Sequence, residues 1–104
     1  MEFNRINPIT DELASSAPAL KAGDVPAIAA RAATAFPAWA AQGPNARRAV
    51  LMKAAEALAA RKDDFVAAMM AETGSTAGWA MFNLMLATGM VREAAAITRR
   101  SLVR

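Results

Sequence analysis

Residues 76–100 read TAGWAMFNLMLATGMVREAAAITRR, and this stretch decides what kind of fold the chain can adopt. Its large apolar residues recur at steps of three or four, which predicts one long helix over 76–100. They are Trp79, Phe82, Leu86 and Met90, and the other sides of the helix carry Met81, Leu84, Met85, Val91 and Ala95. A helix that is apolar on nearly every side must be covered by protein or lipid. The other residues are few for that task, so we expect the chain to be incomplete by itself.

Length, composition and charge limit the classes of function. The chain has 104 residues, enough for one small domain. Hydrophobic residues make up 56% of it, but many are alanines, which favour helices and bring little burial energy. Arg99, Arg100 and Arg104 account for the whole net charge of +3. The remainder is neutral and offers no basic face, so we expect no nucleic-acid partner.

The chain contains no cysteine and no histidine. Thiolate nucleophiles, disulfides, imidazole bases and the usual zinc sites are therefore excluded, and we expect no catalytic, cofactor-binding or metal-binding residue. The first residues lack the apolar core of a signal peptide. The longest uncharged apolar run, 77–91, is too short to cross a bilayer. We therefore expect a cytoplasmic protein with no membrane partner.

The first forty residues predict an extended leader and one helix. Turn signals at 7–8 and 10–11 precede a short extended segment at 13–18. Asp24 is the predicted N-cap of the first helix, and Pro37 is expected to end or kink it. We expect Phe36 and Trp39 to be core anchors.

Two further helices are predicted between this one and the long helix. The first covers 45–60, and its expected buried stripe is Val50, Leu51, Ala54 and Leu58. The second covers 64–72, with Asp63 as its cap. Gly74 suits the left-handed position after a helix, and Ser75 or Thr76 is expected to cap the long helix.

Three groups of residues could have a catalytic or binding role, and each can also be explained by a structural role. The pair Asp63-Asp64 could do acid–base work in an apolar cleft, but its basic neighbours favour a cap with solvated ion pairs. Residues 73–76 could hold an anion at a helix N-terminus, although capping alone explains them. The methionine-rich surface favours core filling over an adaptable binding groove.

Six short motifs occur in an order that resembles a known family. They are NP at 7–8, AFPAW at 35–39, RR at 47–48, ETG at 72–74, GWAMFN at 78–83 and MVREAA at 90–95. Together they resemble the amino-terminal portion of the NAD(P)-dependent aldehyde dehydrogenases, over roughly residues 3–98. The last two motifs are similar to the branch that acts on aromatic aldehydes, the salicylaldehyde dehydrogenases above all.

The resemblance implies a fold, a cofactor and a site. The fold is mainly α: a helical N-terminal segment of an aldehyde dehydrogenase-like α/β fold, with a short extended leader. Residues 1–104 form one partial domain, and 99–104 are a divergent basic tail. NAD or NADP serves the full-length enzymes, and we expect neither to bind this chain alone. The matching helix of the family lines the aldehyde tunnel, which implies that Trp79, Phe82 and Leu86 contact the substrate, with Asn83 adjacent.

The resemblance also implies what is missing. The family's cysteine nucleophile, glutamate base, oxyanion-holding asparagine and nucleotide-binding sheet come later in its sequences. Because 99–104 depart from the family pattern, we interpret the chain as a truncation or a product of a shifted reading frame. We expect a fragment of an oxidoreductase that converts an aromatic aldehyde to its carboxylic acid, inactive by itself, so its own status as an enzyme stays open.

Two alternatives come from other classes of function. The first is a small helical interaction module that self-associates through its long apolar helix, which would otherwise expose a large apolar patch. The second is a helix-turn-helix protein with 76–100 in the major groove of DNA. The early turns of that helix are too apolar to read bases, so we disfavour it.

Overall fold

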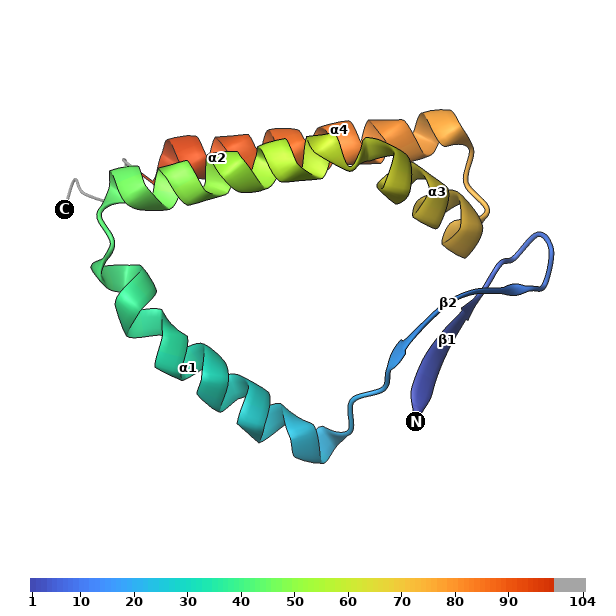
Figure 1. Ribbon diagram of the computed structural model, residues 1–104, viewed down its shortest axis with the longest axis horizontal. Coiled ribbons are helices and arrows are strands. Elements are labelled where there is room, and N and C mark those ends of the chain that lie inside the picture. The colour runs from blue at the N-terminus through green and yellow to red at the C-terminus, as the bar shows by residue number, and fades with distance from the viewer. Residues whose placement is uncertain (99–104) are drawn as a thin grey trace.

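The computed structural model describes residues 1–98, which form a two-stranded hairpin followed by helices (Figure 1). The elements are β1 (Glu2–Ile6), β2 (Leu13–Pro18), the 3₁₀ turn η1 (Ala22–Asp24), α1 (Val25–Ala41), α2 (Pro44–Ala60), α3 (Lys62–Thr73) and α4 (Ala77–Ile97). The predicted fold class, mainly α with a short extended leader, is confirmed. The predicted tail at 99–104 lies outside the described residues.

The core of the chain is the seam between α2 and α4, which lie side by side and run in opposite directions (Figure 1). Four buried residues of α4 recur at helical spacing and form one stripe: Ala80, Leu84, Thr88 and Ala95. From α2, Ala55 is fully buried. Because most of these side chains are small, the two helix backbones can approach closely. Helix α3 then packs against the same helix α4.

The buried stripe of α2 differs from the predicted one. Leu51 and Leu58 are half-buried as expected, but Val50 is 47% exposed and Ala54 is also exposed. The actual stripe runs through Leu51, Ala55 and Leu58, at steps of four and three residues. Ala55, and not Ala54, is the fully buried residue of α2, so the buried stripe is turned by about one residue position at this point.

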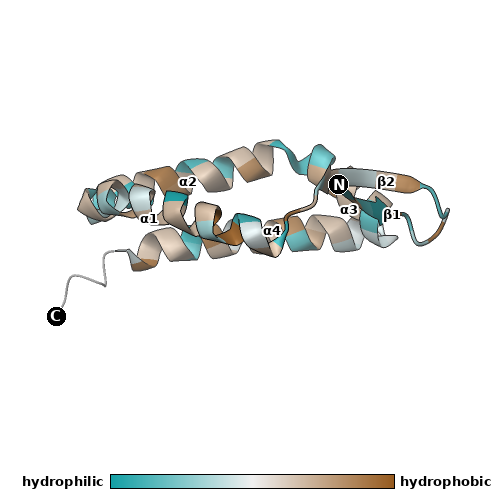
Figure 2. Cartoon of the chain, turned by 90° about the horizontal axis from the view of Figure 1, so that it is seen from below, coloured by the Kyte–Doolittle hydropathy of each residue, from teal (hydrophilic) through white to brown (hydrophobic). Residues whose placement is uncertain are grey.

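Helix α1 leans away from the other helices, so the chain is open (Figure 1). The radius of gyration is 17.7 Å, whereas a compact chain of this length has about 13 Å. Viewed from below, the chain forms a thin layer with hydrophobic segments along its helices (Figure 2). Phe36 is 65% exposed and Trp39 is 38% exposed. The prediction that they anchor a core is wrong for this chain, because no helix within residues 1–98 covers their side of α1.

The sequence predicts that Pro37 ends or kinks the first helix, and the structure contradicts the first of these alternatives. Pro37 lies inside α1, which continues to Ala41. Proline removes one backbone donor and frees the carbonyl of residue 33. Because α1 is exposed along its length, water can reach that carbonyl, and the helix tolerates the lost bond.

Two of the predicted caps are correct, one is correct in position but makes no capping hydrogen bond, and one is wrong. Gly74 has a φ of 70°, the left-handed conformation expected after α3. The Thr76 hydroxyl accepts a hydrogen bond from the Trp79 N–H at 3.2 Å and caps α4. Asp24 is the N-cap residue of α1, as predicted, but its side chain makes no capping hydrogen bond there. Its carboxylate accepts from the Lys21 N–H at 2.8 Å, which closes η1. Asp63 lies inside the first turn of α3 and does not cap it. Its negative charge interacts favourably with the positive end of the helix dipole.

Strand β2 coincides with the extended segment predicted at 13–18, but its partner β1 was not predicted. The strands pair antiparallel, with a register shift between Arg5 and Ile6. Their connection is closed by a hydrogen bond from the Asn7 N–H to the Glu12 carbonyl at 2.8 Å. The Asn7 side chain also accepts from the Ile9 N–H at 2.8 Å, so the predicted turn at 7–8 is confirmed.

The hairpin is attached to the end of α3 by a group that we call the Glu72 cluster, Arg5, Ser15 and Glu72. The Ser15 hydroxyl donates to one carboxylate oxygen of Glu72 at 2.7 Å, and the Arg5 guanidinium pairs with the other. Gly74 lies so close to the hairpin connection that an added Cβ would stand 3.0 Å from Pro8. This contact positions the hairpin at the start of α4.

The Glu72 cluster makes the attachment of the hairpin depend on pH. The hydrogen bond from Ser15, and then that from Arg5, lower the pKa of the Glu72 carboxyl below its usual value. A lowered folded pKa contributes stability that is present above the unfolded pKa and is lost as pH falls through the folded one. We therefore expect the attachment of the hairpin to weaken in acid, as the pH falls from the ordinary glutamate pKa through the lowered pKa of Glu72. Amide exchange at Ser15, followed against pH, measures this.

The control for this prediction is Glu72→Gln, which removes the titrating carboxyl. In that variant, exchange at Ser15 should be faster at neutral pH and should show no transition in acid. An unchanged acid transition in Glu72→Gln would contradict the assignment to Glu72.

Candidate functional site

The outer face of α4, formed by Trp79, Phe82, Leu86 and Met90, lies nearly opposite its buried stripe. At 3.6 residues per turn, positions 82 and 86 point away from positions 80 and 84. Exposure agrees with this geometry: Trp79 is 57%, Phe82 45% and Leu86 49% exposed. The structure therefore brings the three predicted substrate-contacting residues together on one uncovered surface.

The two aromatic rings of this face contact each other. The ring centroids of Trp79 and Phe82 are 5.5 Å apart, with 29° between their planes, a stacked arrangement. Asn83, predicted to lie adjacent, donates its side-chain N–H to the Trp79 carbonyl at 2.9 Å. The Asn83 amide is therefore held by its own helix.

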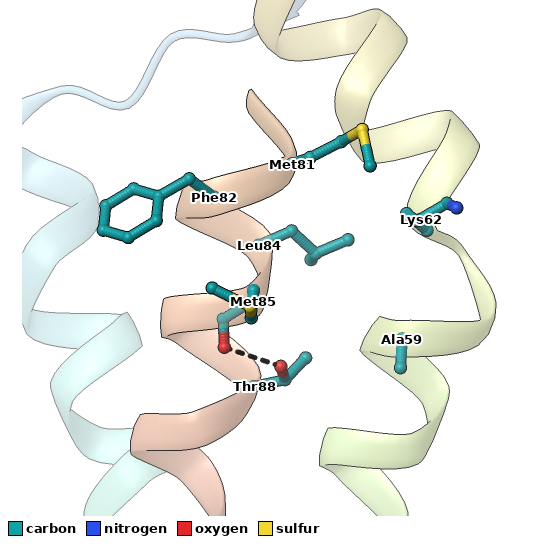
Figure 3. Close-up of a pocket in the computed structure, with 7 residues that line it drawn as sticks. All are labelled: Ala59, Lys62, Met81, Phe82, Leu84, Met85 and Thr88. Atoms are coloured by element: carbon teal, nitrogen blue, oxygen red, sulfur yellow. Dashed lines mark hydrogen bonds between the residues drawn. The ribbon is translucent and has the colours of Figure 1, made fainter. Parts of the chain in front are cut away.

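Two shallow cavities border Phe82. The first, of about 420 Å³, lies between α4 and the junction of α2 with α3 (Figure 3). Its lining residues are Ala59, Lys62, Met81, Phe82, Leu84, Met85 and Thr88. The second, of about 620 Å³, follows the outer face toward the end of α4 and is lined by Phe82, Met85, Leu86, Gly89, Met90, Glu93, Ala94 and Ile97. Both volumes lie in the range of small-molecule pockets.

Met85 is a lining residue of both cavities that the sequence analysis did not assign to the site. It is 65% exposed and follows Phe82 by three residues, so helical spacing was the available signal. Trp79 lines neither of these two cavities. It borders the site only through its stack on Phe82.

The cavities offer apolar contact and little reactive chemistry. The Thr88 hydroxyl already donates to the Met85 carbonyl at 2.9 Å, as Figure 3 shows. Asp64 pairs with Arg61 at 3.1 Å, and both side chains are more than two-thirds exposed, which agrees with the predicted solvated ion pair. Residues 1–98 contain no group of three metal-ligating side chains. The surface can hold an apolar molecule, and its described residues include no nucleophile positioned beside a base.

Before α4, the hydroxyls of Thr73 and Thr76 are hydrogen-bonded within the chain, whereas the Ser75 hydroxyl is buried with no hydrogen-bond partner among the described residues. The Thr73 hydroxyl donates to the Met69 carbonyl at 2.7 Å and accepts from the Ser75 N–H at 3.3 Å. With Thr76 capping α4, the hydrogen bonds of this segment agree with the capping interpretation of 73–76.

The sequence of the chain matches one known family over nearly all its residues. The model of the aldehyde dehydrogenase family matches residues 1–103. The chain belongs to the aldehyde dehydrogenase family. It is 51% identical over 96 residues to a vanillin dehydrogenase from Pseudomonas fluorescens, and 33% identical over 95 residues to a salicylaldehyde dehydrogenase from Pseudomonas putida. These alignments cover 92% and 91% of this chain but 20% of each relative, so the chain spans about a fifth of their length.

Solved structures of aldehyde dehydrogenases share the fold. A salicylaldehyde dehydrogenase from Pseudomonas putida G7, complexed with salicylaldehyde, superposes with a TM-score of 0.88 at 31% identity, covering 93% of this chain and 20% of that one. An NAD-dependent benzaldehyde dehydrogenase from Corynebacterium glutamicum gives 0.90 at 29% identity, covering 96% and 22%. Because nearly the whole chain superposes, these longer aldehyde dehydrogenases contain the same open arrangement of hairpin and helices.

The helices of the described region do not have the length and hydropathy of a membrane span. α4 is the longest, with 21 residues, and its apolar run is interrupted near the end by Arg92 and Glu93.

Proposed function

We propose that this chain is the part of an NAD(P)-dependent aldehyde dehydrogenase that gives an aromatic aldehyde one apolar wall of its binding site. In the complete enzyme, the aldehyde loses a hydride to NAD(P)⁺, and water supplies the second oxygen of the carboxylic acid. The observation that carries the proposal is the outer face of α4, with its exposed Trp79–Phe82 stack. Relatives and structural neighbours named for vanillin, salicylaldehyde and benzaldehyde support it.

The surface chemistry of α4 suits such a substrate. Aromatic rings favour offset-stacked or edge-to-face contacts with other rings. About half of the surface of Phe82 is accessible for contact with a substrate ring. Leu86 and Met85 extend the same apolar surface over the second cavity. Small-molecule sites are mostly apolar, with few polar groups that fix orientation. We therefore assign Trp79, Phe82 and Leu86 to substrate contact, and not to the chemical step.

The nucleophile and the base of the proposed reaction have to come from residues outside this chain. The chain has no cysteine, so it cannot form a covalent thiohemiacetal with an aldehyde. We expect the purified chain to produce no NADH from vanillin, salicylaldehyde or benzaldehyde above a blank without protein. Absorbance of NADH measures this, and steady turnover by the isolated chain would contradict the proposal.

A chimera tests whether this segment can form the wall of the aldehyde-binding site in a complete enzyme. Residues 3–98 replace the aligned segment of the Pseudomonas fluorescens vanillin dehydrogenase, which is 51% identical. We expect the chimera to oxidise vanillin with NAD, because the segment supplies the same wall to the site. The unmodified relative is the control. A chimera that folds and binds NAD but oxidises none of the three aldehydes would overturn the proposed function.

A further inference from the structure

Lys62 is a nucleophilic residue that the proposed function does not use. It is the first residue of α3 and lines the first cavity, the one of about 420 Å³. Figure 3 shows Lys62 on one side of this cavity, with Met81 and Leu84 pointing toward that side from α4. The neighbouring Asp64 pairs with Arg61, and no ion pair of the described chain includes Lys62. The amine is therefore available to a ligand.

The first cavity offers apolar contact and one group that can react. Apart from Lys62, its lining side chains are hydrocarbon or thioether, except for Thr88, whose hydroxyl donates to the Met85 carbonyl. The apolar stem of a lysine can lie along such a surface while the amine stays at the rim. Methionine thioethers fit irregular shapes and make favourable contacts with aromatic rings. A ligand that matches both parts has an aromatic ring and a group that reacts with an amine.

We propose that the first cavity binds an aromatic aldehyde as a reversible imine with Lys62. The nitrogen lone pair of the uncharged amine attacks the carbonyl carbon, and the π electrons of the C=O bond move to the oxygen. The carbinolamine that forms loses its hydroxyl group and the remaining nitrogen-bound proton as water, which leaves a C=N bond. Lysines form such Schiff bases with carbonyl substrates. The step needs no oxidant or reductant, and water reverses it.

This site goes beyond the proposed function, because it requires neither NAD(P) nor the transfer of a hydride. It also lies on a different part of α4. Phe82 lines the first cavity, but Trp79 and Leu86, the other proposed substrate contacts, do not. Binding of the ring in the cavity holds the carbonyl carbon beside the amine, which raises its effective concentration there. Lys62 should therefore react in preference to a lysine on an open surface.

The sequence supplies the comparison that this expectation needs. It contains two other lysines, Lys21 and Lys53. Both are exposed, and neither lines the first or the second cavity. The three lysines of one chain can therefore be compared in a single reaction.

The test is reductive trapping in the full 104-residue chain. The chain is incubated with benzaldehyde and cyanoborohydride, which transfers a hydride to the imine carbon and leaves a stable secondary amine. Digestion with a protease that cuts at acidic residues, followed by mass spectrometry, measures the benzyl group on each lysine. We expect roughly tenfold more labelling at Lys62 than at Lys53 or Lys21, which corresponds to about 1.4 kcal/mol of ring burial. Butanal, which has no ring, should label the three lysines about equally.

Met81→Gln and Met90→Gln form a matched pair on α4. Met81 lines the first cavity and not the second, whereas Met90 lines the second and not the first. Both side chains are about half exposed or more, at 47% and 64%, so we expect both variants to keep the helical circular dichroism of the unmodified chain. Met81→Gln should reduce the preference of benzaldehyde for Lys62, and Met90→Gln should leave it unchanged.

Three outcomes would overturn the proposal. The first is equal labelling of the three lysines by benzaldehyde. The second is a preference for Lys62 that persists in concentrated urea, since it would then arise from neighbours in sequence such as Arg61 and not from the cavity. The third is a preference that Met90→Gln removes and Met81→Gln leaves intact, which would place the ring in the second cavity. None of these measurements involves NAD or turnover, so their results are independent of the proposed function.

Discussion

Leu84→Ala should lower the free energy of unfolding of the chain by about 2–5 kcal/mol. Leu84 is 8% exposed and is the largest residue in the buried stripe of α4. Its truncation leaves a cavity in the seam with α2, where the neighbouring buried residues are small and cannot fill the space. Folded proteins are stable by only about 5–15 kcal/mol, so the loss is a large share of the total. Urea unfolding, followed by helical circular dichroism, measures it.

Leu86→Ala is the matched control on the same helix. Leu86 is 49% exposed, and its truncation removes the same atoms from the outer face. We expect a loss below about 1 kcal/mol, because surface substitutions away from special features change stability little. Equal losses in the two variants would show that the α2–α4 seam is not the core of the chain.

Phe82→Leu in the vanillin dehydrogenase chimera should raise the KM for vanillin roughly tenfold. An aromatic pair contributes about 0.5–1.5 kcal/mol beyond the area that it buries, and 1.4 kcal/mol corresponds to a factor of ten. We expect kcat to change little, since a residue that contributes equally to substrate and transition-state binding affects KM alone. The KM for a straight-chain aldehyde should be less affected, because it gains no ring contact.

Phe36→Leu controls for the chemical change itself. It makes the same substitution on α1, away from the outer face of α4, and it keeps the side chain apolar. We expect vanillin kinetics like those of the unmodified chimera. A Phe82→Leu chimera that matches the Phe36→Leu chimera in KM for vanillin would contradict the assignment of Phe82 to the substrate wall.

The helices could be predicted from the sequence where local signals agree with packing. The left-handed Gly74 and the cap at Thr76 are encoded within a few residues, and both were found. Strand β1 was not predicted, because a two-stranded ribbon with both faces exposed needs no alternation of apolar and polar residues. Asp24 is at the predicted N-cap of α1, but its side chain closes η1 and makes no capping bond to α1. Asp63 lies inside the first turn of α3, because α3 starts earlier than predicted.

The residues that share the outer face of α4 could be predicted from the sequence, whereas the face of α4 that meets α2 could not. Helical spacing alone places Trp79, Phe82 and Leu86 on one face of α4. A helix that is apolar all round does not indicate which face meets α2, and small residues at 80 and 95 decided that contact. Phe36 and Trp39 are residue types that favour a core, but no helix of residues 1–98 covers their side of α1. Their exposure could not be predicted from any local pattern.

The attachment of the hairpin to α3 has a consequence for synthesis of the chain. Arg5 and Glu72 are 67 residues apart in sequence, and translation proceeds at about 5–20 residues per second. A two-stranded hairpin by itself is only marginally stable in water. For the several seconds before Glu72 and Gly74 leave the ribosome, β1 and β2 therefore lack their contacts with the end of α3. The hairpin is translated before α3 but becomes stably ordered only after it, and its exposed backbone is open to chaperones during that interval.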